Sequence, residues 1–308
     1  MKDLSIVIVN WNAVKHLARC LASVYAALSR ERHLRAEVIV VENASTDGSA
    51  RVVKRDFPQA RLIENSVNLG FAAANNQAIS EAKGTYVLLL NPDTDVGLRS
   101  LGALVDFMQE HPEAGAAGSR LLSPDGGLQH SCSPSPTLFR EFWRLLHLDW
   151  IRPYGIYDMT GWQLDSPREV EVLQGACLIV RRQALDEVGL LDEDYFIYTE
   201  EVDLCFRLRS VGWKLFWVPQ AEVVHYGGQS TGQAAETMFL QLYRSKVVYF
   251  RKRYGLVGGR LYKLILFLAS TTRLLAAGLA ILKQPGESDR YAAIARNYQR
   301  LLVSLPAL

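Results

Sequence analysis

The sequence predicts an α/β fold in which a mostly parallel central sheet is flanked by helices. Short apolar runs rich in β-branched residues alternate with segments of helical spacing through the N-terminal part of the chain. The apolar runs end abruptly in Asn, Asp or Glu, as strands do where they leave a buried sheet. Strands that alternate with helices in this way are typical of parallel sheets with right-handed crossovers.

The elements of this sheet follow in chain order. Residues 5–9 predict a buried first strand, and residues 14–28 keep the 3–4 spacing of one apolar helix face. The same reasoning assigns further strands to residues 37–41, 61–64 and 86–90, and further helices to residues 49–57 and to a segment that ends near Gly84.

The composition excludes several classes of protein. The chain has 308 residues and a formal net charge of +2, so its charge does not indicate a nucleic-acid partner. Its four cysteines lie far apart without metal-ligand spacing, which favours buried thiols in a reducing compartment. The N-terminal apolar run is too short for a signal peptide. We therefore expect a cytoplasmic protein, or one attached to a membrane from its cytosolic side.

One stretch, LLLNPDTDV at residues 88–96, carries the first chemical signal. Asp93 and Asp95 stand one residue apart directly after the apolar strand. Ligands of open α/β sheets bind at the carboxyl ends of the strands, and two carboxylates there suit a hard divalent cation. The alternative is an Asx-type turn whose acids cap the next helix. This stretch alone leaves both interpretations open.

Two common nucleotide-binding motifs are absent from the sequence. The turn after the first strand reads NWNAVKH rather than GxGxxG, and no GxxxxGK[ST] occurs. A dinucleotide-binding fingerprint and a P-loop are therefore excluded. The strand ends instead carry Trp11, Glu42 and Asp93, which suit a nucleobase ring, its polar edge and a metal-held diphosphate.

The second half of the chain is less regular. Residues 119–136 are rich in Ser, Pro and Gly and predict a long loop. Residues 140–162 mix aromatic and charged residues, which fits either an acceptor-side lid or an irregular surface. Residues 170–181 predict a strand in which Gly175 permits close backbone approach, and two short strands are expected at residues 214–218 and 222–225.

A cluster of acids marks a helix between these strands. Thr199 can cap a helix whose first turn holds Glu200, Glu201 and Asp203. The helix dipole alone favours carboxylates there, so their position does not by itself establish a catalytic role.

The C-terminal part predicts helices. A helix with a basic end is expected at residues 234–253, followed by a strongly apolar segment at residues 261–282. Its length would span a bilayer, but Arg273 lies near the middle, where a charge is costly. An interfacial amphipathic helix and a helix packed on the globular domain both remain open.

Seven sequence blocks occur in a definite order, namely VNWN, VENASTDGS, NLGFAAANNQAI, LLLNPDTDV, GACLIVRR, GLLDEDYFIYTEEVDLCFR and VVHYGGQST. Their order resembles that of glycosyltransferase family 2, most closely its bacterial rhamnosyltransferase-like branch. The likeness covers residues 4–254, and its specificity comes from the order and spacing of the blocks rather than from any one of them.

The resemblance implies a GT-A fold with a C-terminal helical extension. Residues 1–230 would form the glycosyltransferase domain, with a nucleotide-sugar half at 1–125 and an acceptor half at 126–230, and residues 231–308 the extension. The implied activity is inverting transfer of a sugar, with rhamnose favoured, from a dTDP- or UDP-sugar, assisted by Mn²⁺ or Mg²⁺. The implied acceptor is a lipid-linked or polysaccharide precursor of cell-surface glycan, at the cytosolic face of the plasma membrane with peripheral membrane contact.

The resemblance also implies roles for individual residues. Nucleotide-sugar binding is expected of Asn10, Trp11, Glu42, Asn68, Asn91 and Asp93, and metal binding of Asp93, Asp95 and His225. Glu201 stands at the position of the general base, with neighbouring Glu200 as the other candidate. The family usually has Asp where this chain has Glu42 and Glu201, so each carboxylate reaches further by one methylene.

A non-catalytic nucleotide-sugar-binding or scaffold subunit of the same fold is the alternative function. The two unusual glutamates favour it, and sugar transfer that disappears with a chelator would argue against it. A nucleotidyltransferase is a weaker alternative, because the Gly-rich N-terminal loop with a basic residue that such enzymes use is missing.

Overall fold

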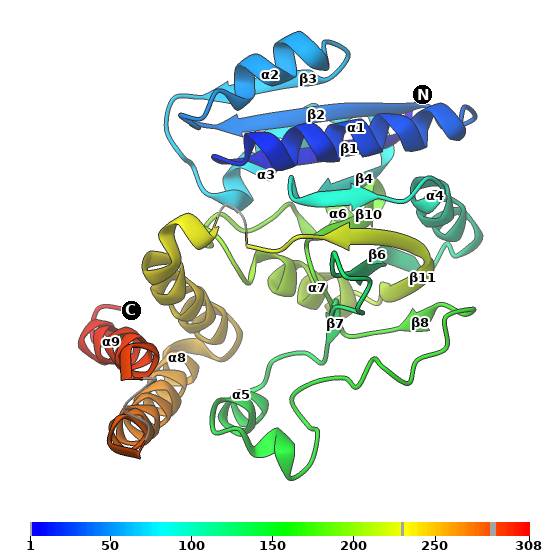
Figure 1. The fold of residues 1–308 in the computed structure, drawn as a ribbon. Helices are drawn as coiled ribbons and strands as arrows, with labels where there is room; N and C mark the ends of the chain where they lie inside the picture. Colours follow the sequence, from blue (N-terminus) through cyan, green and yellow to red (C-terminus); the bar gives the residue numbers. More distant parts are fainter. Residues whose placement is uncertain (1, 229–230, 284–287) are drawn as a thin grey trace. The chain divides into compact units, whose positions relative to one another are not determined.

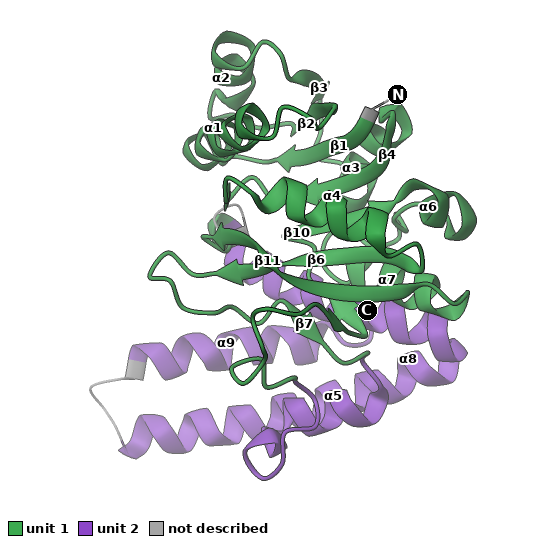
Figure 2. Cartoon of the chain, turned by 90° about the vertical axis from the view of Figure 1, so that its right-hand side faces the viewer, with its two compact units in different colours: residues 1–135, 157–233 green, residues 136–156, 234–308 purple. Residues whose placement is uncertain are grey.

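The computed structural model describes residues 2–228, 231–283 and 288–308. The described residues do not include Gln229 and Ser230 of the last sequence block. The expected domain boundary at residue 230 therefore also lies outside them. The chain divides into two compact units (Figure 2). Unit 1 comprises residues 1–135 and 157–233, and unit 2 comprises residues 136–156 and 234–308.

Unit 1 is built around one mixed sheet in the order β3-β2-β1-β4-β10-β6-β11-β5, with β8 paired to β11 (Figure 1). Its strands are β1 (Lys2–Asn10), β2 (Ala36–Asn43), β3 (Arg61–Asn65), β4 (Gly84–Leu90), β5 (Thr94–Val96), β6 (Ala114–Leu122), β8 (Arg168–Glu169), β10 (Cys177–Arg181) and β11 (Lys214–His225). The pairings among β3, β2, β1 and β4 are all parallel, whereas β10 runs antiparallel to β4 and β6. β7 (Cys132–Ser133) and β9 (Val172–Leu173) form a separate small sheet.

Helices cover both faces of this sheet. The helices of unit 1 are α1 (Val14–Arg30), α2 (Ser49–Asp56), α3 (Phe71–Glu81), α4 (Ser100–Glu110), α6 (Arg182–Val188) and α7 (Glu200–Ser210). Side chains of β4 alternate between the faces: Leu88 packs in one core with α1 and α4, and Leu89 packs in the other with α3, α6 and α7. The predicted sheet flanked by helices is confirmed.

The second half departs from three expected elements. The segment 170–181 is two strands, because the chain turns at Gly175 between β9 and β10. The expected strands at 214–218 and 222–225 are one strand, β11, whose register shifts between Val218 and Glu222. The expected loop at 119–136 begins with strand residues of β6, which pair with β11. β6 contains many small residues and β11 has an irregular register. Hydrophobic periodicity therefore does not predict the bounds of either strand.

Unit 2 is helical. It contains α5 (Leu138–Leu145), the short 3-10 helix η1 (Leu148–Trp150), α8 (Ala235–Lys283) and α9 (Ser288–Ser304). α8 is interrupted at Tyr254 and Gly255, which have non-helical backbone angles. Among the described residues, Gly232–Lys283 is long and apolar enough to cross a membrane, with a mean hydropathy of 1.9 in its most apolar window. Helices buried inside soluble proteins also have this length and composition, so the finding does not choose between the two interpretations of this segment.

All four cysteines are buried and free, as expected. Burial raises the pKa of each thiol to about 12. They are therefore uncharged at neutral pH and behave as small apolar side chains.

Candidate active site

Most of the site residues expected from the sequence gather at the carboxyl ends of β1, β2 and β4. The strands are parallel, and their register places Asn10 opposite Glu42 and Asn43 opposite Asn65. Asn91 directly follows β4 at the same edge. The sheet therefore brings these polar groups together, as its topology requires.

Glu42 organises the first two loops of this edge. The fully buried Asn10 donates from Nδ2 to both Glu42 oxygens, at 3.2 and 3.1 Å. Ser45 donates from Oγ to Glu42 Oε1, and its Oγ accepts from the Asn12 backbone N–H at 2.8 Å. Trp11 lies between Asn10 and Asn12 in the first loop and is partly exposed. The carboxylate of Glu42 is thus held in place by Asn10, the residue before Trp11, and by Ser45, which accepts from the residue after it.

Asn68 links this edge to the loop that precedes α7. Its Oδ1 accepts from Asn43 Nδ2 and from the Gly70 backbone N–H, each at 2.9 Å. Gly70 has φ +88°, and a Cβ atom there would lie 2.5 Å from the Phe196 carbonyl oxygen. The next residue, Phe71, donates its N–H to that same oxygen at 2.6 Å. Only glycine fits this approach, which joins the start of α3 to the loop before the acidic helix.

The aspartate motif is held by main-chain bonds on both sides. The Asn91 N–H donates to the Ala176 carbonyl oxygen at 2.9 Å, and the Tyr226 N–H donates to the Asp93 carbonyl oxygen at 2.9 Å. β5 pairs with β11 so that Thr94 stands opposite His225. Asp93 Oδ1 consequently lies 3.5 Å from His225 Nε2, and both side chains are buried.

Gln129, which the sequence did not identify, fixes the histidine ring. Its Nε2 donates to the His225 carbonyl oxygen at 2.7 Å, which directs its Oε1 toward His225 Nδ1 at 3.0 Å. Because Oε1 can only accept, Nδ1 carries the proton, and in the neutral ring Nε2 presents a lone pair on the side of Asp93. The contact crosses 96 residues, so no local pattern could have revealed it.

Asp95 is directed elsewhere. Its Oδ2 lies 2.6 Å from Arg19 Nη2 and accepts from the Tyr226 hydroxyl at 3.2 Å, while the Arg19 guanidinium lies over the Tyr226 ring. The structure brings Asp93 and His225 together but pairs Asp95 with Arg19. Within residues 2–228, 231–283 and 288–308, no group of three or more His, Cys, Asp or Glu side chains could hold a metal ion.

The two neighbouring acids at the start of α7 differ in their surroundings. Glu200 is 5 % exposed, and burial, followed by the charge of Glu201, raises its pKa well above the usual value. Glu201 is more exposed and lies against Gly175, where an added Cβ would stand 3.6 Å from the Glu201 Cβ. Ala176, the residue after Gly175, bonds to Asn91. The Cβ atom of Glu201 therefore lies beside the segment that bonds to the aspartate motif.

The start of α7 is strained rather than capped. Thr199 occupies the N-cap position, but its side chain makes no capping hydrogen bond, so the expected cap is wrong. Tyr198 and Thr199 have φ values of 68° and 75°, which are unfavourable for residues with side chains and are commonly found near functional sites. The third acid, Asp203, accepts from Arg207 Nε at 2.7 Å and so has a structural partner on its own helix.

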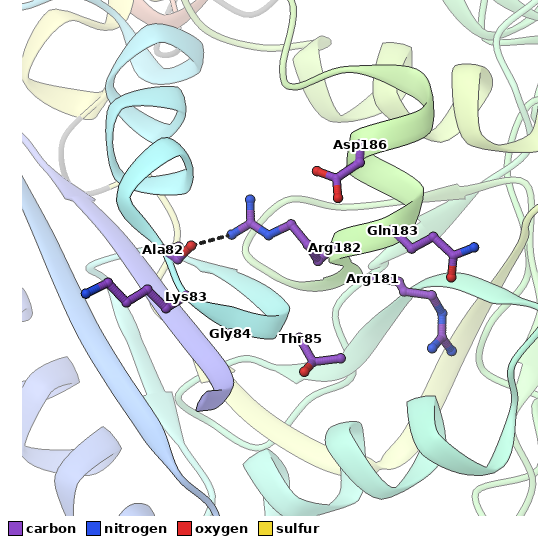
Figure 3. Close-up of a pocket in the computed structure, with 8 residues that line it drawn as sticks. All are labelled: Ala82, Lys83, Gly84, Thr85, Arg181, Arg182, Gln183 and Asp186. Atoms are coloured by element: carbon purple, nitrogen blue, oxygen red, sulfur yellow. Dashed lines mark hydrogen bonds between the residues drawn. The ribbon is translucent and has the colours of Figure 1, made fainter. Parts of the chain in front are cut away.

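A cavity of about 490 Å³ lies away from these residues (Figure 3). It is lined by the first residues of β4, Gly84 and Thr85, and therefore opens at the amino end of that strand. Arg182 in its wall donates to the Ala82 and Ile79 carbonyl oxygens that end α3, at 3.0 and 3.2 Å. This arginine satisfies a helix terminus, so we assign no ligand to the cavity.

Comparisons with known proteins identify the family of this chain. The model of "Glycosyl transferase family 2" matches residues 5–189, and that of "Glycosyl transferase family group 2" matches residues 154–282. An N-acetylglucosaminyl-diphospho-decaprenol L-rhamnosyltransferase of Mycobacterium tuberculosis is 34% identical over 271 residues, which cover 82% of this chain and 85% of that protein.

Two solved structures show the same fold at low identity. The first is a mannosyltransferase of Pyrobaculum calidifontis in complex with GDP-Man and Mn²⁺, with a TM-score of 0.57, 18% identity and coverage of 100% of this chain and 88% of that one. The second is GalNAc-T7 with UDP, GalNAc and Mn²⁺, with a TM-score of 0.55, 16% identity and coverage of 73% and 44%. The expected GT-A fold is confirmed.

Proposed function

Because the chain belongs to glycosyl transferase family 2, we propose that it transfers rhamnose from a nucleotide sugar to a lipid-linked diphosphate acceptor in cell-surface glycan synthesis. The likeness to the mycobacterial rhamnosyltransferase, which extends over most of both chains, is the observation that carries this proposal. The glycosyltransferase activity is that of the family, and the donor and acceptor are taken from the named relative.

Asp93 and His225 fit a divalent cation such as Mn²⁺ or Mg²⁺. Their oxygen and nitrogen donors face each other at 3.5 Å, and the bond from Nδ1 to Gln129 leaves Nε2 available for coordination. Two protein ligands leave positions for diphosphate oxygens and water. A bound cation would neutralise charge on the departing diphosphate. Asp95 is the weaker candidate ligand, since Arg19 pairs with it.

Glu201 supplies the base in this proposal. It accepts the proton of the attacking acceptor hydroxyl while the new oxygen–carbon bond forms at the anomeric centre. The bond from that centre to the diphosphate oxygen breaks, and the leaving nucleoside diphosphate keeps the electron pair. One displacement inverts the anomeric configuration. Burial and the charge of Glu201 raise the pKa of Glu200 well above its usual value, which makes Glu200 the less suitable base.

The nucleotide end of the site is assigned to the loops after β1, β2 and β3. Trp11 directly follows Asn10, which donates to the Glu42 carboxylate, and Asn68 fixes the loop that meets Phe196. The division into a nucleotide-sugar half at 1–125 and an acceptor half at 126–230 remains part of this proposal, as does the extension at 231–308.

We expect Gln129→Leu to weaken Mn²⁺ affinity about 10–100-fold, because the loss of a bond that orients a metal-ligating histidine has effects of this size. Calorimetric titration of the full chain with Mn²⁺ and a nucleoside diphosphate measures the change. Gln183→Leu, on α6, removes an amide far from His225 and serves as the matched control. An unchanged titration with Gln129→Leu would contradict the role of Gln129 in orienting His225.

A thermal-shift screen tests the proposed donor. With Mn²⁺ present, dTDP-rhamnose should raise the Tm of the full chain more than UDP- or GDP-sugars do, and a chelator should remove most of that shift. If another sugar nucleotide raised the Tm more than dTDP-rhamnose does, that sugar nucleotide would be the donor instead. Donor binding without transfer to any lipid-linked acceptor would support the non-catalytic subunit instead.

The exposed leucines of α8 favour contact with the cytosolic face of the plasma membrane. Leu275, Leu279 and Leu282 are 66%, 60% and 79% exposed, and Lys283 follows them. We expect the paired variant Leu275→Glu and Leu279→Glu to reduce binding of the full chain to anionic vesicles at least about tenfold in co-sedimentation. A control pair on the exposed face of α9, Ala293→Glu and Gln299→Glu, adds the same charge. Equal loss in both pairs would show that charge, not the apolar face, controls binding.

A further inference from the structure

Arg19 of α1 contacts Asp95 through one carboxylate oxygen only. Its Nη2 lies 2.6 Å from Asp95 Oδ2, and the Tyr226 hydroxyl donates to that same oxygen at 3.2 Å. The other oxygen, Asp95 Oδ1, is buried and accepts no hydrogen bond from any residue that the structure describes. A buried carboxylate oxygen without a donor is unfavourable, so the bond to Arg19 leaves Asp95 incompletely stabilised.

The pair of Arg35 and Asp3 shows a closed ion pair in the same unit. Arg35 Nη2 donates to Asp3 Oδ1 at 2.8 Å, and Arg35 Nε donates to Asp3 Oδ2 at 3.2 Å. Both oxygens of Asp3 are thus satisfied, in the two-bond geometry that guanidinium and carboxylate groups prefer. The two arginine side chains are similarly exposed, at 59% for Arg19 and 63% for Arg35. The open geometry of Arg19 is therefore a property of its site rather than of its exposure.

The Arg19 guanidinium can leave Asp95 at low cost. An ion pair with so exposed an arginine contributes little to stability, because water solvates the separated charges. The guanidinium also lies over the Tyr226 ring, 4.6 Å from its centre, and this contact keeps the cation at the site whichever anion it binds. A guanidinium donates two parallel bonds to a phosphate group, whereas Arg19 contacts Asp95 at one oxygen. We therefore expect a diphosphate to displace Asp95 from Arg19.

Tyr226 places this ion pair beside the proposed cation ligands. Its backbone N–H donates to the Asp93 carbonyl oxygen at 2.9 Å, while its hydroxyl donates to Asp95. It also directly follows His225, whose Nε2 lies 3.5 Å from Asp93 Oδ1. Asp95 and Arg19 consequently lie next to the two residues that fit a divalent cation. Once Arg19 releases it, Asp95 offers a further carboxylate of the kind that hard divalent cations bind.

We propose that Arg19 exchanges its bond to Asp95 for the diphosphate of the nucleotide donor, and that the released Asp95 then completes the cation site. The inference rests on the proposed function, which identifies the donor as a nucleotide sugar. It adds a coupling between two ligands. The diphosphate favours cation binding because it removes Arg19 from Asp95, and by linkage the cation favours diphosphate binding to the same extent. In the absence of diphosphate, Arg19 keeps Asp95 from the cation.

Calorimetric titrations of the full chain with dTDP and with Mn²⁺ test the exchange. In a buffer with a chelator, we expect Arg19→Gln to raise the Kd of dTDP at least about tenfold, as the loss of a charge-assisted hydrogen bond does. Without nucleotide, the same variant should lower the Kd of Mn²⁺ at least about fivefold, because Asp95 is no longer held. The opposite signs are the decisive readout, since the loss of a merely structural residue would weaken both ligands.

Three further variants make the result specific. Arg35→Gln removes the exposed arginine that pairs with Asp3, and it should leave both Kd values unchanged. Arg19→Lys keeps the charge but cannot form two parallel bonds, so its dTDP affinity should lie between those of Arg19→Gln and the unmodified protein. Asp95→Asn frees Arg19, so in the chelator buffer it should bind dTDP at least as tightly as the unmodified protein. Matching thermal denaturation curves establish that each variant is folded.

Two results would overturn the exchange. In the first, Arg19→Gln binds dTDP as tightly as the unmodified protein, so Arg19 does not bind the diphosphate. In the second, Arg19→Gln weakens the binding of dTDP and of Mn²⁺ together, so Arg19 only supports the local structure. In both cases dTDP still binds the unmodified protein, and the proposed function stands. If the unmodified protein binds neither dTDP nor UDP, with or without Mn²⁺, the proposed function fails and the exchange fails with it.

Discussion

Replacing Glu201 with Gln is expected to lower kcat for sugar transfer by about 10²–10⁴-fold, the range that a general base contributes. The amide keeps the size of the side chain and its packing against Gly175, but it cannot accept the proton of the acceptor hydroxyl. Donor affinity should therefore stay close to that of the unmodified protein. Release of nucleoside diphosphate in the presence of acceptor measures kcat, and calorimetry with the donor measures affinity.

Two further variants make this result specific. Glu110→Gln, at the exposed end of α4, is the matched control and should transfer sugar at the normal rate. Glu200→Gln should lose far less activity than Glu201→Gln, because an amide resembles the protonated carboxyl that the raised pKa of Glu200 favours. Normal transfer by Glu201→Gln together with loss in Glu200→Gln would assign the base to Glu200 instead.

The raised pKa of Glu200 also sets the sign of a pH effect. As the pH rises above 4.5, the ordinary pKa of a glutamate, Glu200 of the unfolded chain loses its proton while Glu200 of the folded chain keeps it. The folded state therefore binds more protons than the unfolded state in this pH interval. Stability then falls as the pH rises through this interval. In denaturant titrations Glu200→Gln should flatten that decline. A decline of the same slope in the variant would show that Glu200 does not cause it.

Asp93→Asn is expected to weaken metal-dependent donor binding by about 100-fold or more, beyond the range for residues that only support a ligand. The substitution keeps the shape of a buried side chain while removing its charge. Calorimetric titration with donor and Mn²⁺ should show the loss, and a chelator should reduce the unmodified protein to a similar affinity. Asp95→Asn is the comparison, and its smaller effect follows from its pairing with Arg19. Undiminished donor binding by Asp93→Asn would contradict the metal assignment.

The first half of the fold could be predicted because its signals are local. β1, β2 and β4 are apolar runs that end in Asn or Glu, and their parallel register brings those ends together. The candidate site residues of this half follow from the same rule. The pairing of Asp93 with His225 could be predicted only from the family resemblance. The two residues lie far apart in the sequence, and hydrophobic periodicity does not indicate which strands pair.

Other features depend on contacts that no short window contains. β6 reads AGAAGSRLL, whose small residues lack the β-branched signal of a strand, yet it is buried between β10 and β11. Gln129 lies in a loop and is identified only by its bonds to His225. The position of Asp95 depends on Arg19, which comes from α1. In each case tertiary packing, rather than local preference, decides the outcome.

The order of strands in the sheet has a consequence for how the chain folds. β10 lies between β4 and β6, and β11 lies between β6 and β5, so both later strands insert among earlier ones. Until residues 177–225 have been synthesised, β4, β5 and β6 have unpaired edges of the kind that promote aggregation. The parallel half of the sheet can assemble early, whereas the environment of Asp93 is completed last. A nascent chain that stops before His225 should therefore be retained by chaperones, and release should coincide with the closing of the β11 ladder.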